Sequence, residues 1–353
     1  MKILIVKLSA IGDVIHTLPA LNALRRHFPE AHIAWLVEKG GAELIDGHPA
    51  LDRIIVSNRK QWLKGLRTAG ALNHLRSIRN FIRELRDTHY DLIIDFQGLL
   101  KSGMLVGLAR GTRKIGFGRG LQRDEGAYLF LNECVPAADM DRHALERNLI
   151  LVKALGITAN DIEYRIPMGQ GEQAAVAGLL KEYGVDASRP LVALNPLTRW
   201  ETKMWRCDRF AELADRIIDN FDAAVVFTGS AADRGLLASI IAAMKHPAVN
   251  LGGRTTLKEL AVLYTKCALA VTTDTGPMHL AAAVGTPVVA LFGPTAPWRT
   301  GPYGAIHKVV RAELECSPCF RRQCPTFTCM ERISVDQVMA AIHEQGLRQS
   351  EYS

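Results

Sequence analysis

The chain has 353 residues, of which 48% are hydrophobic and 22% are charged, a balance that excludes disordered and collagen-like proteins. At roughly 150 residues per domain, this length predicts two domains. The formal net charge is +7 but is uneven, because residues 53–123 hold 15 Lys and Arg against 4 Asp and Glu. That portion predicts an anionic partner: nucleic acid, an anionic membrane surface, or a phosphorylated or carboxylated substrate.

Short β-branched or aliphatic runs alternate with segments of helical length along the chain. The expected strands are Ile3–Val6, His32–Val37, Arg53–Val56, Asp91–Asp95, Lys114–Phe117, Leu191–Leu194, Ala223–Phe227, Ala248–Leu251, Leu269–Thr272 and Pro287–Phe292. The expected helices are Leu18–His27, Leu72–Arg86, Leu99–Ala109, Ala144–Leu155, Phe210–Asn220, Ala231–Lys245 and Leu257–Tyr264. This alternation indicates βαβ units and parallel sheets that are covered on both faces.

The alternation occurs twice, with an interruption around Pro167–Pro190 that contains one helix-like stretch. We therefore expect an α/β protein with two Rossmann-like, doubly wound domains, residues 1–170 and 185–335, followed by a C-terminal segment, 336–353. Such sheets bind ligands at the carboxyl ends of their strands, so two facing sheets would form a cleft. Neither half contains G-x-G-x-x-G or G-x-x-x-x-G-K-[ST], which argues against a nicotinamide dehydrogenase and a P-loop ATPase.

The sequence contains few signals that indicate the cellular compartment of the protein. No apolar run reaches the ~18 residues of a membrane span. Lys7 and Asp13 interrupt the apolar N-terminal stretch and no small-residue cleavage site follows, so we expect a mature cytoplasmic start. Seven cysteines without an export signal favour free thiols over a disulfide framework.

The strongest local signal is an apolar strand that ends at Asp274 and leads into a helix start. Thr275 is a candidate helix cap, and Pro277 suits the first turn. The backbone N–H groups there, uncrowded at Gly276, would bind a diphosphate, to which His279 could also donate. Asp274 could accept from sugar hydroxyls. A capped core helix with a buried histidine explains the same residues equally well.

A second candidate is the loop Asn195–Trp205, which follows the first strand of the second half. Thr198 and Lys203 are donors suited to neutralising phosphate charge without a metal. Taken alone, a surface loop with Trp205 as a packing anchor is the better explanation. The segment Phe292–Thr295 repeats the pattern after a further strand, in position to line the same site.

Asp13 follows the first strand and is the third candidate. An Asp at this place is commonly a helix cap. A carboxylate that faces a cleft could instead remove a proton from an incoming hydroxyl. Both interpretations stay open on the sequence.

Three other patterns carry less information. Asp139 and Asp141 imitate a D-x-D metal motif but lie in a polar loop without a preceding apolar strand. Arg76, Arg79, Arg83 and Arg86 recur at helical spacing, which is typical of a solvated helix face. The four thiols of Cys316, Cys319, Cys324 and Cys329 match neither the usual zinc nor the usual iron–sulfur spacing, so we expect a reduced or disulfide-closed loop.

Three segments together resemble the lipopolysaccharide heptosyltransferases, glycosyltransferase family 9. They are Ile3–Pro19, Ile94–Ser102, and Asp274–His279 followed by Gly293–Thr295. The match runs in order over nearly the whole chain and is specific as a combination. The first segment is more similar to members that add the first heptose to Kdo, whereas the cysteine-rich loop is more similar to second-heptose transferases. The acceptor therefore stays open.

This resemblance implies a GT-B architecture and an inverting, metal-independent transfer from ADP-L-glycero-β-D-manno-heptose, with no cofactor. It implies an anionic, lipid-linked saccharide acceptor on the cytoplasmic face of the inner membrane, where the enzyme would be peripheral on an anionic surface. The last helix, near Val335–Gln345, is expected to cross back to the first domain, as GT-B enzymes often do.

The resemblance also implies residue roles. Asp13 would be the catalytic base, and Thr198 and Lys203 would bind the diphosphate. Asp233 stands where the family has a Glu that holds the ribose, and Asp274, Thr275, Gly276 and His279 match the donor-binding turn. The first domain would bind the acceptor, with Lys60, Lys64, Gln97 and Arg119 as the expected contacts.

Alternatives from other classes remain. Another GT-B nucleotide-sugar enzyme, such as an epimerase, would share the donor site. A non-catalytic nucleotide-binding protein would keep the diphosphate turn without needing Asp13. A nucleic-acid partner is not expected, because few aromatic residues are interleaved with the basic ones.

Overall fold

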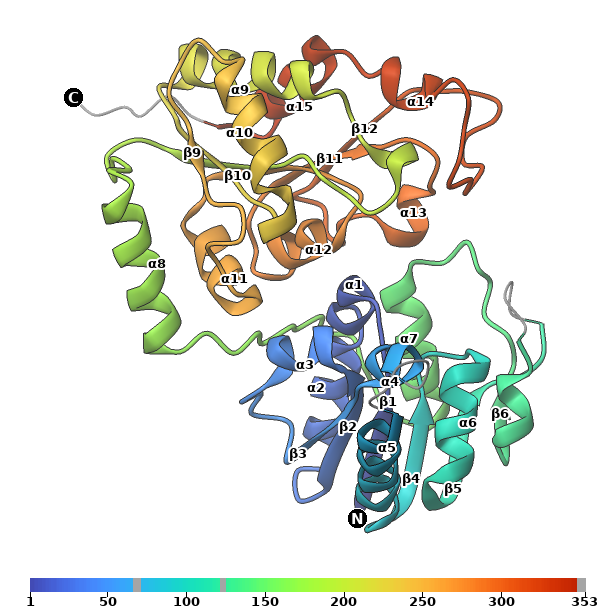
Figure 1. The fold of residues 1–353 in the computed structure, drawn as a ribbon. Coiled ribbons are helices and arrows are strands. Elements are labelled where there is room, and N and C mark those ends of the chain that lie inside the picture. Colours follow the sequence, from blue (N-terminus) through green and yellow to red (C-terminus); the bar gives the residue numbers. More distant parts are fainter. Residues whose placement is uncertain (66–70, 121–124, 348–353) are drawn as a thin grey trace. The chain divides into compact units, whose positions relative to one another are not determined.

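The structure, a computed structural model, describes residues 1–65, 71–120 and 125–347 (Figure 1). The chain divides into two compact units, residues 1–167 and 168–353. Each unit contains one six-stranded sheet in which all strand pairs are parallel. The α/β class and the two Rossmann-like sheets are thus as the sequence predicted.

The first unit contains six strands and seven α-helices within its described residues. The strands are β1 (Lys2–Val6), β2 (His32–Glu38), β3 (Arg53–Ser57), β4 (His89–Asp95), β5 (Arg110–Phe117) and β6 (Glu133–Val135). The helices are α1 (Ile11–Ile15), α2 (Leu18–His27), α3 (Lys39–Ile45), α4 (Arg59–Gly65), α5 (Ala71–Arg86), α6 (Leu100–Leu108) and α7 (Ala144–Ala154), with the 3₁₀ turn η1 (Ala127–Phe130). The strand order is β3-β2-β1-β4-β5-β6. Successive strands are therefore added toward one edge up to β3 and toward the other edge from β4, and the order reverses between β1 and β4.

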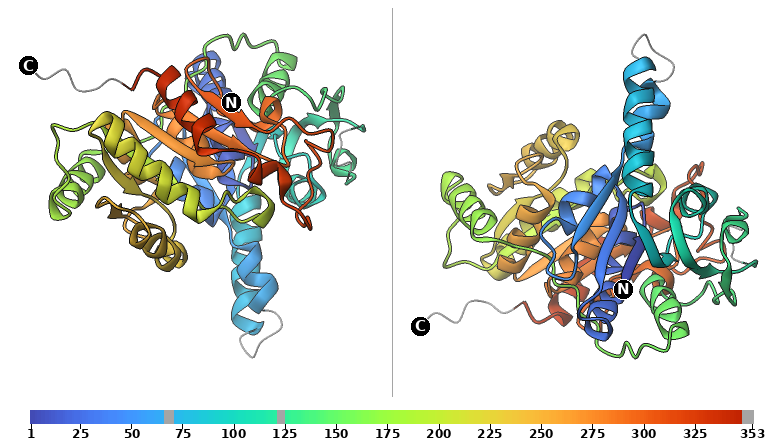
Figure 2. Two further views of the ribbon diagram at one scale, coloured as in Figure 1. Left: turned by 90° about the horizontal axis from the view of Figure 1, so that it is seen from above. Right: turned by 90° about the horizontal axis from the view of Figure 1, so that it is seen from below.

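Both faces of this sheet are buried, as expected for parallel strands between helices. Leu4 and Val6 of β1 lie in one core cluster with Phe81 and Leu85 of α5, whereas the alternate side chain of Ile5 is buried toward the opposite face. The arginines of α5 lie on its exposed face, which confirms the predicted solvated stripe. Figure 2 shows α5 extending outward from the body of the first unit.

The second unit has the same topology. Its strands are β7 (Leu191–Asn195), β8 (Ala224–Phe227), β9 (Val249–Asn250), β10 (Leu269–Thr273), β11 (Val288–Phe292) and β12 (Lys308–Arg311). Its helices are α8 (Gln170–Glu182), α9 (Cys207–Phe221), α10 (Arg234–Ala242), α11 (Leu257–Lys266), α12 (Gly276–Ala283), α13 (Pro297–Thr300), α14 (Thr328–Glu331) and α15 (Val335–Glu344), with the 3₁₀ turns η2 (Glu201–Lys203) and η3 (Ala231–Asp233). The order β12-β11-β10-β7-β8-β9 reverses between β7 and β10.

The last helix, α15, belongs to the second unit. Its crossing to the first domain stays a prediction. Val338 and Ile342 are fully buried in the same core cluster as Phe210 of α9. Ion pairs reinforce this packing, including Arg216 Nη1 to Asp336 Oδ1 at 2.7 Å. The apolar face of α15 is therefore used within its own unit; residues 348–353 lie outside the described part.

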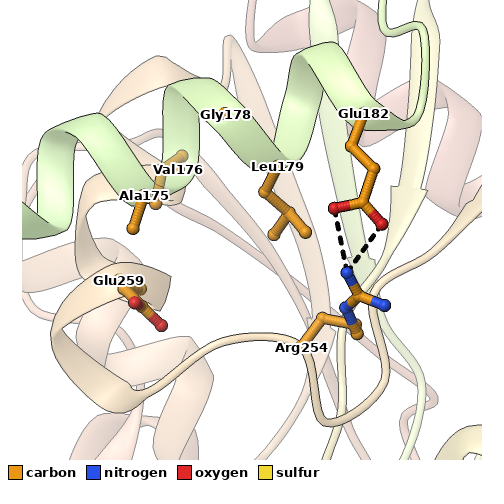
Figure 3. A pocket seen from close by; sticks show the side chains of 7 residues that line it. All are labelled: Ala175, Val176, Gly178, Leu179, Glu182, Arg254 and Glu259. Atoms are coloured by element: carbon orange, nitrogen blue, oxygen red, sulfur yellow. Dashed lines mark hydrogen bonds and ion pairs between the residues drawn. The ribbon is translucent and has the colours of Figure 1, made fainter.

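Helix α8 also belongs to the second unit, although the predicted domain boundary left it between the two. It packs against α11, and a hollow of about 400 Å³ lies between α8 and the segment that enters α11 (Figure 3). Arg254 Nη2 donates to both carboxylate oxygens of Glu182 there, at 2.8 and 3.0 Å. None of the predicted site residues lines this hollow.

Among the described residues, no helix combines the length and the apolar composition that crossing a bilayer requires.

Candidate active site

In the second unit, two predicted motifs meet at the reversal point of the sheet. Ligands of open parallel sheets bind at this point, beyond the carboxyl ends of the strands. The loop after β7 leads through Thr198 to Lys203 in η2, and the loop after β10 begins at Asp274. Lys203 Nζ donates to Asp274 Oδ2 at 2.6 Å. Two segments separated by 71 residues therefore form one cluster.

Asp274 is held by a second donor from a third loop. Its side chain is only 6% exposed, so its charge requires hydrogen-bond partners. Thr295, which follows β11, donates through Oγ1 to the same oxygen, Oδ2, at 2.6 Å. Lys203 Nζ also lies 4.5 Å from the ring centre of Trp200, a cation–π contact. The carboxylate and the ammonium are thus fixed in orientation before any ligand binds.

The start of α12 lies directly after this cluster. Thr275 occupies the N-cap position and Pro277 lies in the first turn, as predicted, but no capping hydrogen bond to the Thr275 side chain forms, so that part of the prediction is wrong. His279 is buried, one turn into the helix. Because the first-turn N–H groups of a helix attract anions, the cluster and the helix start together can neutralise a diphosphate.

Asp233 lies in η3, after the neighbouring strand β8. Its Oδ2 accepts hydrogen bonds from Ser230 N at 2.7 Å and from Ser230 Oγ at 2.6 Å. The carboxylate therefore caps its own short helix. A role for Asp233 toward a ribose stays a prediction, as does a diphosphate contact from the half-buried Thr198.

In the first unit, the loops after β1 and β4 are tied to each other at the reversal point of that sheet. Gln97 Oε1 accepts from the backbone N–H groups of Leu8 at 3.0 Å and Ser9 at 3.1 Å. Lys101 Nζ donates to Ser9 Oγ at 3.0 Å. These contacts position the loop that enters α1, which contains Asp13.

The side chain of Asp13 is 42% exposed. Its Oδ2 accepts from Ala10 N at 2.8 Å, which is the cap interaction, and its Oδ1 lies 4.0 Å from Lys7 Nζ. Burial lowers the pKa of Lys7, and the nearby carboxylates of Asp13 and Asp95 oppose that shift. Asp13 thus caps a helix turn while remaining open to solvent beside a buried amine, so the two interpretations of this residue are compatible.

Asp95, at the end of β4, is a buried carboxylate that the sequence analysis did not single out. Burial raises the pKa of Asp95, while hydrogen bonds from Gly98 N and Ser102 Oγ lower it. Because it also accepts from Gln97 N at 2.9 Å, Asp95 fixes the loop that carries Gln97. Asp95 is therefore a positioning residue for this loop.

The chain is similar to known proteins in sequence and in structure. The sequence model of glycosyltransferase family 9 (heptosyltransferase) matches residues 78–329. Lipopolysaccharide heptosyltransferase 1 of Pseudomonas aeruginosa is 35% identical over 92% of this chain and 87% of that protein. The corresponding protein of Escherichia coli K12 is 32% identical over 89% of this chain and 95% of its own length.

The chain belongs to glycosyltransferase family 9. A solved structure, E. coli heptosyltransferase WaaC with ADP, is 28% identical with a TM-score of 0.77, and the match covers 98% of this chain and 100% of that one. The protein is therefore a glycosyltransferase of the GT-B class.

The four predicted acceptor residues lie beyond the carboxyl ends of strands in the first unit. Lys60 and Lys64 are exposed on α4, and Arg119 is exposed after β5. Lys60 Nζ forms an ion pair with Glu38 Oε2 at 2.7 Å, so part of its charge is already compensated. Burial alone would raise the pKa of Glu38, but the hydrogen bond from Lys60 and the charge of Lys101 lower it. Gln97 contacts the Asp13 loop through its side-chain carbonyl, a positioning contact that the sequence could not reveal.

The cysteine-containing segment 316–329 packs on the donor-side loops, which the sequence analysis missed. Thr202 Oγ1 donates to Arg321 O at 2.9 Å, and Phe320 N donates to Pro294 O at 2.8 Å. Arg322 lies 4.7 Å from the ring centre of Trp200. This segment therefore braces both the loop of Lys203 and the loop of Thr295.

All seven cysteines are free thiols in the structure. The four in segment 316–329 line one small cavity of about 60 Å³. Within the described ranges, no group of three or more His, Cys, Asp or Glu side chains is arranged to hold a metal ion. Asp139 Oδ1 accepts from Asp141 N at 2.9 Å, a local turn contact. Trp205 is a buried packing anchor, as expected, and donates to Ile333 O at 2.9 Å.

Proposed function

We propose that this protein transfers L-glycero-D-manno-heptose from ADP-heptose to the Kdo residue of the lipopolysaccharide inner core. The observation that carries this proposal is the cluster of Lys203, Asp274 and Thr295 at the start of α12, in a chain of glycosyltransferase family 9. The relatives named lipopolysaccharide heptosyltransferase 1 favour the first heptose as the transferred unit.

The donor half of the mechanism requires charge stabilisation. When the glycosidic bond to the diphosphate breaks, negative charge develops on the leaving ADP. Lys203 and the N–H groups at Gly276 are preorganised to stabilise it, which is the role that a metal ion has in other transferases. Asp274 then fixes Lys203 and accepts a hydrogen bond from a hydroxyl of the donor sugar. We therefore propose a metal-independent transfer without a cofactor.

The acceptor half requires a base. A sugar hydroxyl is a weak nucleophile until it loses its proton, and Asp13 takes that proton as the new bond forms at the anomeric carbon, with inversion. Lys7 stabilises the carboxylate of Asp13 between turnovers. The exposed basic residues of the first unit, including Lys64 and Arg119, contact the anionic acceptor. Because this acceptor is lipid-linked, the protein works as a peripheral enzyme on the cytoplasmic face of the inner membrane, without a nucleic-acid partner.

The deciding experiment incubates the purified protein with ADP-heptose and either Kdo-lipid A or heptosyl-Kdo-lipid A, with mass spectrometry of the products. We expect one added heptose on Kdo-lipid A and none on the heptosylated acceptor. Transfer only to heptosyl-Kdo-lipid A would identify a second-heptose transferase. Binding of ADP without any product would identify a non-catalytic nucleotide-binding protein. Conversion of the donor without transfer to either acceptor would indicate an epimerase.

A further inference from the structure

Helix α6 and the turn η1 present an apolar surface that the proposed chemistry does not use. Leu100, Met104 and Leu108 recur at every fourth residue, so they lie along one face of α6. Their side chains are 42%, 48% and 38% exposed, and Leu129 of η1 is 72% exposed. We call these four residues the apolar stripe.

The packing of η1 places Leu129 next to the helix. A Cβ atom on Gly103 would lie 2.9 Å from Ala127 Cα, and one on Gly107 would lie 2.6 Å from a ring carbon of Phe130. Two glycines of α6 therefore allow the backbone of η1 to approach closely. Figure 1 shows α6 on the flank of the first unit, where it packs against β4 and η1.

The outer face of α6 is unusual for a surface helix. Its inner face is already apolar, with Val106 fully buried in the core of the first unit. A helix on a water-exposed flank normally has a polar outer face. Since α6 is apolar on both faces, the outer one is built to contact something other than water.

Basic groups lie along the stripe, and one carboxylate lies at its first end, where Glu125 Oε2 accepts from Leu100 N at 3.2 Å. Lys101 lies half-buried on α6 itself, and Arg110 is exposed just after the helix ends. Lys114 Nζ lies 3.5 Å from Gly107 O, at the end of the exposed face. The partner that matches apolar side chains within a basic rim has an apolar interior and an anionic surface.

The stripe also begins beside the loop that leads to Asp13. Lys101, one residue after Leu100, donates to Ser9 Oγ in the loop that leads to Asp13. A lipid-linked substrate held in a bilayer at this flank would thus have its headgroup near that loop.

We propose that the apolar stripe and its basic rim dock the first unit on an anionic phospholipid bilayer, with α6 lying in the plane of the interface. A helix of nine residues is only about 14 Å long, so α6 lies in the membrane surface and does not cross it. A second copy of the chain is the poorer partner, because a symmetric contact would place the basic rims against each other. The proposal depends on the proposed lipid-linked acceptor only for its purpose, since membrane binding is measured without any substrate.

The test is flotation of the full chain with vesicles of phosphatidylcholine containing 30% phosphatidylglycerol or none, where the percentage sets a moderate surface charge of about the physiological order. The double variant Met104→Glu, Leu108→Glu is compared with Leu236→Glu, a control at an equally exposed leucine of α10. We expect the wild type and the control to float with anionic vesicles, less so at high salt, and the double variant to bind about tenfold more weakly or worse.

A second readout separates docking from catalysis. Transfer to a deacylated, soluble acceptor should be unchanged in the double variant, whereas the KM for the lipid-linked acceptor in vesicles should rise. Equal flotation of the double variant and the wild type would overturn the proposal. A wild-type dimer that the double variant dissociates would also overturn it, because the stripe would then be an interface between copies. Loss of transfer to both acceptors in every protein would contradict the proposed function and leave the flotation result intact.

Discussion

At the scale of single residues, Asp13 combines two roles that one substitution separates. Asn at this position keeps an oxygen that can accept from Ala10 N but cannot take up a proton. We expect Asp13→Asn to lower kcat by at least ~10²-fold, the usual contribution of a general base. The affinity for ADP-heptose and the melting temperature should change little, as measured by calorimetry and steady-state kinetics. If turnover survives and the melting temperature falls by several degrees, Asp13 is only a helix cap.

Lys203 and Thr295 donate to the same oxygen of Asp274, so their substitutions form a graded series. We expect Lys203→Ala to cost roughly 2–4 kcal/mol in kcat/KM, the scale of a preorganised donor to developing charge. Thr295→Val should cost less, about 1.5–3 kcal/mol, because the positive charge remains. Thr295→Ser, which keeps the hydroxyl, is the matched control. If Lys203→Ala has wild-type kinetics, the loop of Lys203 is a surface loop and does not bind the donor.

His48 predicts a measurable pH dependence of stability. The side chain is buried, its Nδ1 accepts from Ala50 N at 3.1 Å, and burial lowers its pKa from 6.5 to about 4. Between pH 6.5 and about pH 4, His48 is therefore protonated in the unfolded chain and neutral in the folded chain. This contribution is complete above about pH 6.5 and is lost as the pH falls toward 4.

We expect the free energy of unfolding of the wild type to fall by about 2 kcal/mol between pH 7 and pH 5 from this residue alone. The variant His48→Asn, which can still accept from Ala50 N, should lack that part of the slope in urea unfolding. Parallel slopes in the two proteins would show that His48 does not contribute.

How far the sequence predicts the site is clearest at Asp274. The end of an apolar strand at this acid, followed by a helix start, identifies it as a site residue. Its partner Thr295 lies 21 residues away in a loop whose position depends on the neighbouring strand. Hydroxyl side chains after strands are common, so only the folded sheet reveals which one meets the carboxylate. The contacts of Gln97 with the Asp13 loop escape the sequence for the same reason.

At the scale of elements, α5 allows a test of the acceptor side. Phe81 and Leu85 anchor the helix in the core, which leaves its arginines on the exposed face. We expect Arg79→Glu with Arg83→Glu to raise the acceptor KM by about tenfold, since each charge near an anionic partner contributes on the order of 1 kcal/mol. The donor KM should not change.

The control for this experiment reverses Lys181 on α8 and Lys266 on α11, which are exposed in the second unit. Kinetics at fixed ionic strength compare the two double variants. A fall in donor affinity in the α5 variant would mean that the first unit does not bind the acceptor.

Helices and strands are predictable from the sequence where their own residues form a clear apolar pattern. They are not predictable where packing against neighbouring elements determines the structure. The central strands are continuous apolar runs and were predicted to within a few residues. The edge strands β6 and β12 were missed, because segments such as Lys308–Arg311 offer two apolar residues between charges. The amphipathic pattern of α15 predicts a helix, but the pattern does not contain the information about which core its apolar face joins.

At the scale of the whole molecule, metal independence is the property to test. We expect the transfer rate in EDTA to equal that in magnesium, because Lys203 and the start of α12 provide the positive potential for the leaving ADP. Rates measured after dialysis against the chelator decide this. Activity that disappears and returns with Mn²⁺ would point back to Asp139 and Asp141.

The packing of α15 has a consequence for how the protein is made. All six strands of the first unit lie within the first 167 residues, so that core can fold while the ribosome is still extending the chain. The second core includes Val338 and Ile342, close to the last residues translated. At typical elongation rates, translation of the second unit is completed on the order of 10 to 40 seconds after that of the first unit. During that interval the nascent second sheet lacks the helix that covers α9, and it is the half of the protein with the greater need for protection by chaperones.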